Sequence, residues 1–395
     1  MFRSSLKSFL ATAKNTLNRP ASQQPTPLTL VVGNESADLD SLCCAIVYAY
    51  LRSQPRNDAD RQQRVPPTGL HVPLSHLPRA DLGLRPELTA VLAHAGLAPA
   101  DLITLSELPD LSSTDESTRW ILVDHNALTG PLARFAHRVV GCVDHHDDEG
   151  TVPSNASPRV IEPCGSCMSL VVDETRRDWD ALTGRNAHDD DALAKLCLAP
   201  ILVDTINLSP IAKKVRPKDT RAVDYLEAKL SRKGTYSRHV FYDEISAAKD
   251  DLSRLSMRDL LRKDYKQWRE NHLVLGISCS VADLSALIEK ATGPKHLLDS
   301  LSDWSDERGL DVAAIMTAST TDGSFHRHLL VWGRSPRGDA AVARFVEHAR
   351  QPLRLESWRR GELDDGESRF AWHQRELAAS RKRVGPLMRE AMRKA

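Results

Sequence analysis

Aspartate and histidine side chains follow four apolar segments of this sequence, and their types and positions indicate metal-dependent chemistry. A carboxylate at the end of a buried segment loses hydration and repels its neighbours, which costs several kcal/mol unless cations or hydrogen-bond donors compensate. Divalent metal ions would supply that compensation. The four segments, each with the side chains that follow it, are 28–32 with Asp38 and Asp40, 120–123 with Asp124, 139–143 with Asp144, His145 and His146, and 201–203 with Asp204.

Five aspartates and two histidines suit a pair of hard cations about 3.5–4 Å apart, as in phosphatases that use water as the nucleophile. The Asp38-x-Asp40 pair alone would be weak evidence, because such pairs are common in solvated loops. The run Asp144-His145-His146 is stronger evidence, because one histidine can bind a metal while its neighbour faces a substrate oxygen. Together the four segments predict a binuclear metal centre.

Short β-like runs and helical stretches alternate around these residues, which predicts an α/β domain with a mainly parallel sheet flanked by helices. The first unit is the clearest. We expect a strand at Leu28–Val32, a loop at 33–40, and a helix at Ser41–Leu51 capped within the Asp40/Ser41 pair. In open sheets of this kind, ligands bind beyond the carboxyl ends of the strands. The segment Leu196–Val203 fits either a helix or a strand.

A length of 395 residues predicts two domains. The strand and helix pattern after residue 250 predicts that the second is a smaller α/β domain. The predicted parts are an N-terminal helix and lead-in at 1–27, the metal-binding domain at 28–230, a linker at 231–250 and the second domain at 251–395. Within them we expect solvated loops at 53–67 and 110–118, a charged helical segment at 246–269, strands at 273–281, 312–317 and 328–332, and a helix near the C-terminus.

Composition excludes few classes of function. Hydrophobic residues make up 41% of the chain, and no apolar stretch approaches the 18 residues of a membrane span. Lys+Arg and Asp+Glu both number 53, so the net charge argues neither for nor against a polyanionic partner. The seven cysteines lie mostly in apolar stretches, as reduced core residues do. We therefore expect a cytoplasmic protein.

The first 19 residues contain lysine and arginine but no acidic residue. This composition fits a mitochondrial presequence. It also fits an amphipathic helix that packs Leu6, Phe9, Leu10 and Ala13 on the domain. We favour the packed helix and keep a mitochondrial location as the alternative.

Seven motifs connect the sequence to a known family. The chain resembles the DHH phosphoesterase superfamily, which includes the manganese-dependent family II inorganic pyrophosphatases, and within it the fungal (yeast-type) cytosolic exopolyphosphatase branch. The first and the last two motifs favour this branch. In chain order, the motifs are Gly-Asn-Glu-Ser-Ala-Asp-Leu-Asp-Ser at 33–41, Leu-Val-Asp-His-Asn at 122–126, Val-Asp-His-His at 143–146, Gly-Ser-Cys at 165–167, Ile-Leu-Val-Asp-Thr at 201–205, Leu-Arg-Lys-Asp-Tyr-Lys at 261–266 and Ala-Ser-Arg-Lys at 379–382.

The resemblance implies two metal ions, with Asp124 bridging them. Related pyrophosphatases usually carry a histidine where Asn34 stands. An oxygen-rich site without that imidazole suits Mg²⁺, with Mn²⁺ or Co²⁺ as substitutes. The implied ligands are Asn34, Asp38 and Asp124 for one ion, and Asp40, Asp124, His145 and Asp204 for the other.

The resemblance also implies a mixed sheet in the second domain, an active site in the interdomain cleft, and roles for residues around the metals. Two cations would provide a hydroxide-like water for in-line attack on a terminal phosphoryl group. Asp144 could bind a metal directly or hydrogen-bond a ligand histidine. The implied catalytic residues are Asp124, Asp144 and His146, and the implied substrate-binding residues are His146, Lys263, Lys266, His326, Arg381 and Lys382.

The predicted function is that of an exopolyphosphatase, which releases orthophosphate from the end of linear inorganic polyphosphate. The alternatives are a pyrophosphatase, another DHH phosphoesterase acting on short or nucleotide-linked phosphates, or a scaffold that has lost catalysis. We expect a monomer that binds no nucleic acid or membrane. Two features stay open: the Cys164-x-x-Cys167 pair fits a phosphate loop better than a zinc or redox site, and the basic run at 213–218 fits a polyphosphate contact or a solvated face.

Overall fold

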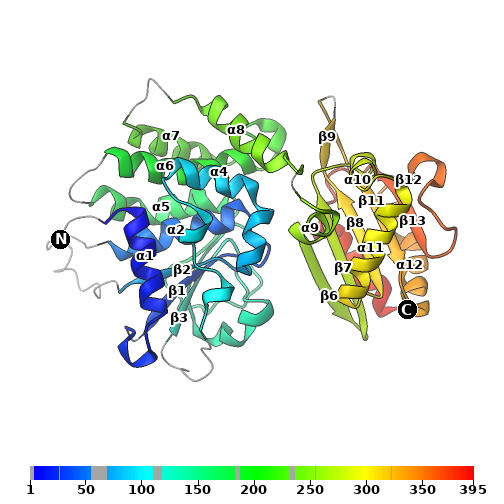
Figure 1. The fold of residues 1–395 in the computed structure, drawn as a ribbon, viewed down its shortest axis with the longest axis horizontal. Coiled ribbons are helices and arrows are strands. Elements are labelled where there is room, and N and C mark those ends of the chain that lie inside the picture. The colour runs from blue at the N-terminus through cyan, green and yellow to red at the C-terminus, as the bar shows by residue number, and fades with distance from the viewer. Residues whose placement is uncertain are drawn as a thin grey trace. The chain divides into compact units, whose positions relative to one another are not determined.

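The computed structural model describes residues 4–25, 27–54, 69–109, 118–182, 187–231, 236–253, 255–321 and 323–395. The chain forms two compact units, Met1–Lys249 and Asp250–Ala395 (Figure 1). The predicted loops at 53–67 and 110–118 lie almost entirely outside the described residues. Helix α8 (Arg238–Asp250) occupies most of the predicted linker, and it buries Phe241 and Ile245 in the core of the N-terminal unit.

The N-terminal unit is built on a five-stranded parallel sheet in the order β2-β1-β3-β4-β5. This confirms the predicted parallel sheet. Val32 at the end of β1 pairs with Leu74 of β2 and Leu122 of β3, and Val123 pairs with Val143 of β4. The carboxyl ends of four neighbouring strands therefore lie at one edge. The strands are β1 (Leu28–Val32), β2 (His71–Leu74), β3 (Thr118–Val123), β4 (Val139–Asp144) and β5 (Arg159–Ile161).

Helices cover this sheet because strand side chains alternate between two apolar faces. Val31 and Val123 pack into the core that contains α2, whereas Leu30 and Leu122 pack with Phe135 on the opposite face. Besides α8, the α-helices described in this unit are α1 (Leu6–Leu17), α2 (Leu39–Ser53), α4 (Pro86–His94), α5 (Cys167–Asp180), α6 (Ala187–Asp204) and α7 (Pro217–Lys229).

Helix α1 packs as predicted. Leu6, Phe9, Leu10 and Ala13 are buried, and Ser5 caps the helix by accepting a hydrogen bond from the Ser8 amide. The helix is thus part of the core of the N-terminal unit.

The C-terminal unit contains a six-stranded mixed sheet in the order β12-β13-β11-β8-β7-β6. Only β7 and β8 run parallel in it, and the predicted mixed sheet is confirmed. Strands β9 and β10 form a separate antiparallel pair. The elements of the C-terminal unit are α9 (Met257–Lys263), β6 (Tyr265–Glu270), β7 (Leu273–Ser280), α10 (Leu284–Lys290), α11 (Pro294–Arg308), β8 (Val312–Thr317), β9 (Ser319–Thr321), β10 (Ser324–His326), β11 (His328–Gly333), α12 (Pro336–Ala349), β12 (Leu355–Ser357), β13 (Arg369–Gln374) and α13 (Arg381–Arg393).

Three local expectations are corrected or resolved. The N-cap of α2 is Asp38, not Asp40 or Ser41, because the Asp38 carboxylate accepts a hydrogen bond from the Ser41 amide at 3.0 Å. The segment before Asp204 is helical. The expected helix through 265–269 is instead the edge strand β6.

Among the described residues, no helix is long and apolar enough to cross a membrane.

Candidate metal centre

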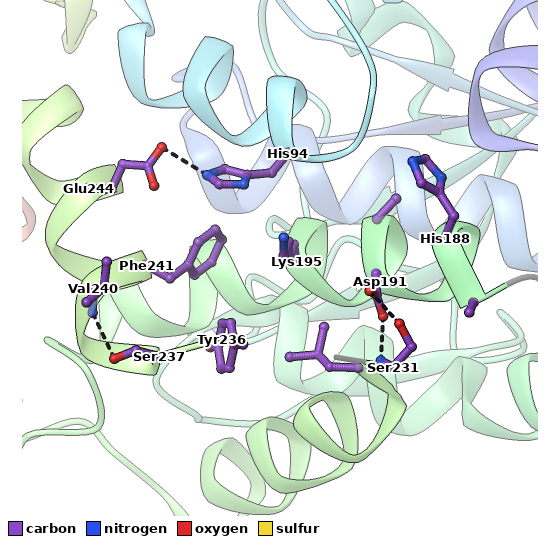
Figure 2. A pocket seen from close by; sticks show the side chains of 13 residues that line it. His94, His188, Asp191, Lys195, Ser231, Tyr236, Ser237, Val240, Phe241 and Glu244 are labelled. Carbon is purple, nitrogen blue, oxygen red and sulfur yellow. Dashed lines mark hydrogen bonds and ion pairs between the residues drawn. The ribbon is translucent and has the colours of Figure 1, made fainter. Parts of the chain in front are cut away.

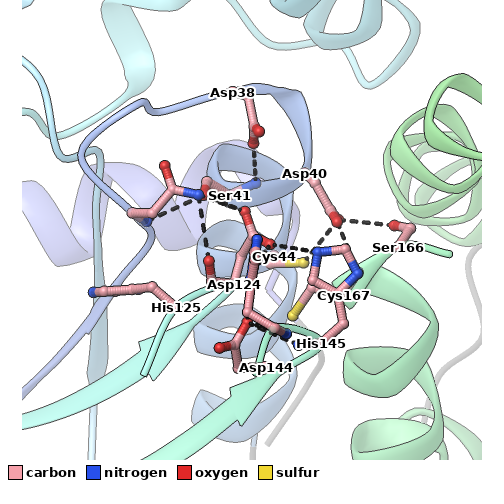
Figure 3. Close-up of polar contacts among 12 residues, drawn as sticks. Asp38, Asp40, Ser41, Cys44, Asp124, His125, Asp144, His145, Ser166 and Cys167 are labelled. Atoms are coloured by element: carbon pink, nitrogen blue, oxygen red, sulfur yellow. Dashed lines mark hydrogen bonds and ion pairs between the residues drawn. The ribbon is translucent and has the colours of Figure 1, made fainter. Parts of the chain in front are cut away.

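Five of the predicted site residues gather at the carboxyl edge of the N-terminal sheet: Asp38, Asp40, Asp124, Asp144 and His145 (Figure 3). Asp204 ends α6 and lies near enough to Asp40 for the two carboxylates to repel each other. Asn34 and Asp38 follow β1, Asp124 follows β3, and Asp144 ends β4. Asp40 lies in the first turn of α2. The parallel sheet and the short turns after its strands therefore bring together side chains that are up to 110 positions apart in the sequence.

Asp124 is the centre of this cluster. It is 2% exposed and adopts a left-handed backbone conformation with φ of 60°, which aspartate tolerates better than most residues. Its Oδ2 atom accepts hydrogen bonds from Ser41 Oγ at 2.6 Å and Asn34 Nδ2 at 2.9 Å. Its Oδ1 atom lies 3.2 Å from His145 Nε2. Both carboxylate oxygens are thus fixed in position.

Asn34 holds Asp124 through its amide group. Its Oδ1 atom accepts hydrogen bonds from the amides of Ser36 at 2.8 Å and Ala37 at 3.2 Å. These bonds fix the amide orientation, so that Nδ2 is the atom facing Asp124. The structure therefore shows Asn34 as a donor to the carboxylate, although the sequence predicted it as a metal ligand.

His145 is oriented by a backbone carbonyl. Its Nδ1 atom lies 3.1 Å from the carbonyl oxygen of Cys164. Because a carbonyl only accepts, Nδ1 carries a proton, and Nε2 is left to face Asp124. Burial opposes a positive charge here, but the hydrogen bonds to Asp124 and Cys164 raise the pKa of His145 well above its ordinary value. A proton held on Nδ1 by a backbone carbonyl makes Nε2 the ligand atom, as is typical of histidines that bind metal ions, and an incoming ion would displace the proton from Nε2.

Asp144 accepts hydrogen bonds from the loop that follows β4 and carries the two histidines. It is fully buried, and its Oδ1 atom accepts hydrogen bonds from the His145 amide at 2.8 Å and from His146 Nδ1 at 2.8 Å. Its Oδ2 atom accepts from Asn126 Nδ2 at 2.6 Å. These donors hold the pKa of Asp144 below its ordinary value despite burial. Of the two predicted alternatives, the hydrogen bonds favour a role in orienting the histidines.

Asp40 joins α2 to the start of α5. Its Oδ1 atom accepts hydrogen bonds from Ser166 Oγ at 2.9 Å and the Met168 amide at 3.0 Å, and its Oδ2 atom accepts from the Cys167 amide at 2.7 Å. The amino end of a helix favours a negative charge. The Cys44 thiol also donates to Asp40, at 3.3 Å.

The loop that supplies these donors is held in turn by Asp219. This buried carboxylate accepts hydrogen bonds from the amides of Gly165 at 2.9 Å and Ser166 at 3.3 Å, from Ser169 Oγ at 2.7 Å and from the Arg216 amide at 2.7 Å. A Cβ atom on Gly165 would lie 2.8 Å from Asp219 Oδ2, so the close approach requires glycine.

The carboxylates carry negative charge that nothing in the described structure fully neutralises. Burial and Asp124 raise the pKa of Asp40 to about 6, burial and Asp38 raise that of Asp124 to about 6, and burial and Asp40 raise that of Asp204 to about 7. One ligand atom each from Asp124, His145 and His146 lie within 4.8 Å of one another. Donor types, spacing and excess charge all fit divalent cations.

Protons and divalent cations should compete for these carboxylates. Because the pKa values of Asp40, Asp124 and Asp204 are raised, these groups bind more protons in the folded, metal-free protein than in the unfolded chain, and their contribution to stability should fall as the pH rises from about 4 to about 7. Added Mg²⁺ or Mn²⁺ replaces those protons. The gain in melting temperature should therefore be small at pH 5 and about 5 °C or more at pH 8. Thermal melts with metal or chelator at both pH values test this, and an equal gain at both would contradict it.

Two predicted cations, Arg381 and Lys266, lie near Cys279 of the C-terminal sheet. Arg381, in the first turn of α13, donates to the carbonyl and carboxylate of Asp264 at 2.8 and 2.7 Å. Burial raises the pKa of Cys279 to about 12, and Arg381 and Lys266, together with Arg327, oppose that rise. All three cations are therefore close enough to Cys279 to influence its thiol. The other predicted residues are Lys263 at the end of α9, His326 on β10 and Lys382, which is exposed on α13.

The structure also shows contacts of the two features that the sequence left open, the basic run at 213–218 and the Cys164/Cys167 pair. Lys218 of the basic run forms ion pairs with Glu162 and Asp173, which favours a surface role for that residue. Cys164 and Cys167 are free thiols that donate to the carbonyl oxygens of Ser166 and Val143. The loop interpretation of this pair agrees with the contacts.

A cavity of about 700 Å³ lies elsewhere in the N-terminal unit, between α4, α6 and α8 (Figure 2). Several of its polar side chains pair with one another: His94 with Glu244 at 2.9 Å, and Asp191 with Ser231. None of the predicted site residues is among its described lining residues. The carboxylate cluster is therefore the better candidate for catalysis.

Comparison with known proteins identifies the family of this chain. Residues 29–201 match the model of the DHH family, N-terminal domain, and residues 243–391 match the DHHA2 domain. A Schizosaccharomyces pombe protein named "Putative exopolyphosphatase" is 32% identical over 95% of this chain and 94% of its own length. "Exopolyphosphatase PRUNE1" of Homo sapiens is 27% identical over 95% of this chain and 78% of its own length.

A more distant relative shares the two-unit fold. The "Manganese-dependent inorganic pyrophosphatase" of Methanocaldococcus jannaschii is 24% identical over 68% of this chain and 76% of its own length. The crystal structure of a "putative family II inorganic pyrophosphatase" from Methanococcus jannaschii covers 92% of this chain and 99% of its own, with a TM-score of 0.55 and 20% identity. The chain thus belongs to the DHH family of metal-dependent phosphoesterases.

The sequence did not show how several residues hold the carboxylates of the site. Ser41 and Ser166 lie within the motifs used for the family resemblance, but their hydroxyl contacts to Asp124 and Asp40 need the structure. Asn126 donates to Asp144 and to the Asp147 carbonyl, which ties the loops after β3 and β4 together. Adjacent hydroxyl and amide residues in a motif were the available signal.

Proposed function

We propose that this protein is an exopolyphosphatase that releases orthophosphate from the end of linear inorganic polyphosphate. The similarity to the S. pombe protein, 32% over 95% of the chain, carries the proposal. Similarity to PRUNE1 supports it, and so does Asn34 in the position where the pyrophosphatases of the resemblance usually carry histidine. The presence of every predicted carboxylate argues against a scaffold without catalysis.

We propose Asp38 and Asp124 as ligands of one ion, with Asn34 fixing Asp124. For the second ion we propose Asp124 again, together with Asp40, His145 and Asp204. When bound, two divalent cations would lower the pKa of water and neutralise charge on a terminal phosphoryl group. Mg²⁺ is the proposed ion, with Mn²⁺ and Co²⁺ as substitutes.

His146 is the proposed contact to the phosphate. Asp144 holds its Nδ1 atom at 2.8 Å, which leaves Nε2 available to hydrogen-bond a phosphate oxygen. Phosphoryl transfer depends mostly on positioning and electrostatic stabilisation. We propose that the C-terminal unit contributes cations for the phosphate chain, with Arg381 and Lys266 as the principal residues and Lys263, His326 and Lys382 as the others.

One set of assays tests substrate and metal together. Phosphate release should be measured from pyrophosphate, tripolyphosphate and long-chain polyphosphate, each with Mg²⁺, Mn²⁺ or Co²⁺. We expect release from the two chain substrates to exceed release from pyrophosphate. Faster hydrolysis of pyrophosphate would favour the second candidate, a pyrophosphatase, which the similarity to the M. jannaschii enzyme supports.

We also propose a cytoplasmic monomer whose activity needs neither nucleic acid nor a membrane. The seven free thiols support a reducing compartment, and the packing of α1 in the core supports a structural role for the basic N-terminal segment.

A further inference from the structure

Two buried side chains from outside the family motifs hold the loop that carries Asn34 and Asp38. His76 follows the carboxyl end of β2, next to β1 in the sheet, and its Nδ1 atom lies 3.3 Å from the Gly33 carbonyl oxygen. Arg85, at the N-cap of α4, donates from Nη2 to the Ser36 carbonyl oxygen. His76 is 4% exposed and Arg85 is 7% exposed. Both donors therefore act in a largely dry environment.

The loop backbone needs this support. Ala37 adopts a left-handed conformation with φ of 46°, which is unfavourable for a residue with a Cβ atom. Gly33 packs so closely on α2 that a Cβ atom there would lie 2.8 Å from the Ser41 carbonyl oxygen. Strained backbone persists only where its surroundings determine it. His76 and Arg85 fix a carbonyl near each end of the strained segment.

The chemistry of the two donors suits this task. Arginine is rarely buried unless its charge is used, and a guanidinium group donates in a fixed planar geometry. Burial lowers the pKa of His76, so its imidazole is neutral and can donate from Nδ1 without adding charge. We infer that Arg85 and His76 are positioning residues: by fixing the Ser36 and Gly33 carbonyls, they set Asn34 and Asp38 for a divalent cation.

This inference rests on the proposed metal centre but not on turnover, so metal binding provides the test. Mn²⁺ binding to the metal-depleted full chain can be followed by electron paramagnetic resonance. Arg85→Gln should weaken binding at one of the two ions about 10- to 100-fold, as the loss of residues behind metal ligands typically does. Arg85→Lys, which keeps a cationic donor, should recover part of that loss.

The chain offers a matched control. Arg79 begins the short helical segment Arg79–Leu84, donates to the carbonyls of Pro99 and Leu102, and pairs with Glu107. Arg79→Gln should lower the melting temperature and leave Mn²⁺ binding unchanged. If Arg85→Gln also lowers only the melting temperature, the inference is overturned.

A second variant keeps the test valid if Arg85→Gln does not fold. His76→Phe retains ring volume and removes the donor, so it should weaken Mn²⁺ binding about tenfold, while His76→Asn should restore a donor and part of the affinity. Unchanged Mn²⁺ binding in His76→Phe would overturn the inference. A wild-type protein that binds Mn²⁺ but hydrolyses none of the phosphates would refute only the proposed function.

Discussion

Replacing Asp124 with asparagine should reduce polyphosphate hydrolysis at least about a thousandfold. The carboxylate is proposed to bind both ions, so its loss removes several kcal/mol of stabilisation from the transition state. The asparagine oxygen can keep the hydrogen bonds from Ser41 Oγ and Asn34 Nδ2, with its amide nitrogen facing His145 Nε2 in place of Oδ1, so the variant should still fold. Phosphate release at saturating Mg²⁺ measures the effect.

The melting temperature of the variant distinguishes a loss of catalysis from misfolding. Repulsion from Asp124 contributes to the raised pKa of Asp40, so removing the charge should keep or increase the melting temperature in chelator. Asp173→Ala is a suitable control, because that carboxylate is 63% exposed on α5. Activity in Asp124→Asn close to the wild-type value would refute the assigned centre.

Replacing Asp219 with alanine should lower the free energy of unfolding by about 3–5 kcal/mol. The substitution leaves four donors without their acceptor: the amides of Gly165, Ser166 and Arg216 and the hydroxyl of Ser169. Leaving buried donors unpaired is costly, and Gly165 and Ser166 are both buried. Because Ser166 donates to Asp40, metal affinity should decrease as well. Urea unfolding in chelator measures the first effect, and Mn²⁺ titration measures the second.

Asp224→Ala is the matched control for Asp219. It lies on the same helix, α7, and is exposed. This control should change the free energy of unfolding by less than about 0.5 kcal/mol. A loss below about 1 kcal/mol in Asp219→Ala would show that the loop holds itself without the buried carboxylate.

The strands and helices that carry the site were largely predictable. Leu28–Val32 and Val312–Thr317 were expected as strands and are β1 and β8, because short apolar runs bounded by polar or turn residues are typical of buried strands. Leu196–Val203 was ambiguous for a physical reason. Helix α6 packs against α2, α4 and α7, so its segment 196–203 is almost wholly buried, apolar on all sides, and shows no helical period.

Edge strands and orientations could not be predicted. Strand β6 reads Tyr-Lys-Gln-Trp-Arg-Glu and is nowhere fully buried, so its charged residues resembled a continuation of the helix before it. Residue types and spacing indicated a metal centre, but the direction of the Asn34 amide depends on the backbone of Ser36 and Ala37. The contribution of Asp219 depends on a contact made 54 positions away.

The thiols beneath the carboxylates bear on selectivity between metals. Cys44 donates to Asp40, and burial, together with the neighbouring Cys167, raises the pKa of the Cys44 thiol well above its ordinary value. Only the ionised form of sulfur binds zinc or reacts readily with disulfides. At neutral pH the site therefore presents oxygen and imidazole nitrogen to an incoming ion, and its sulfur atoms should stay unreactive in air.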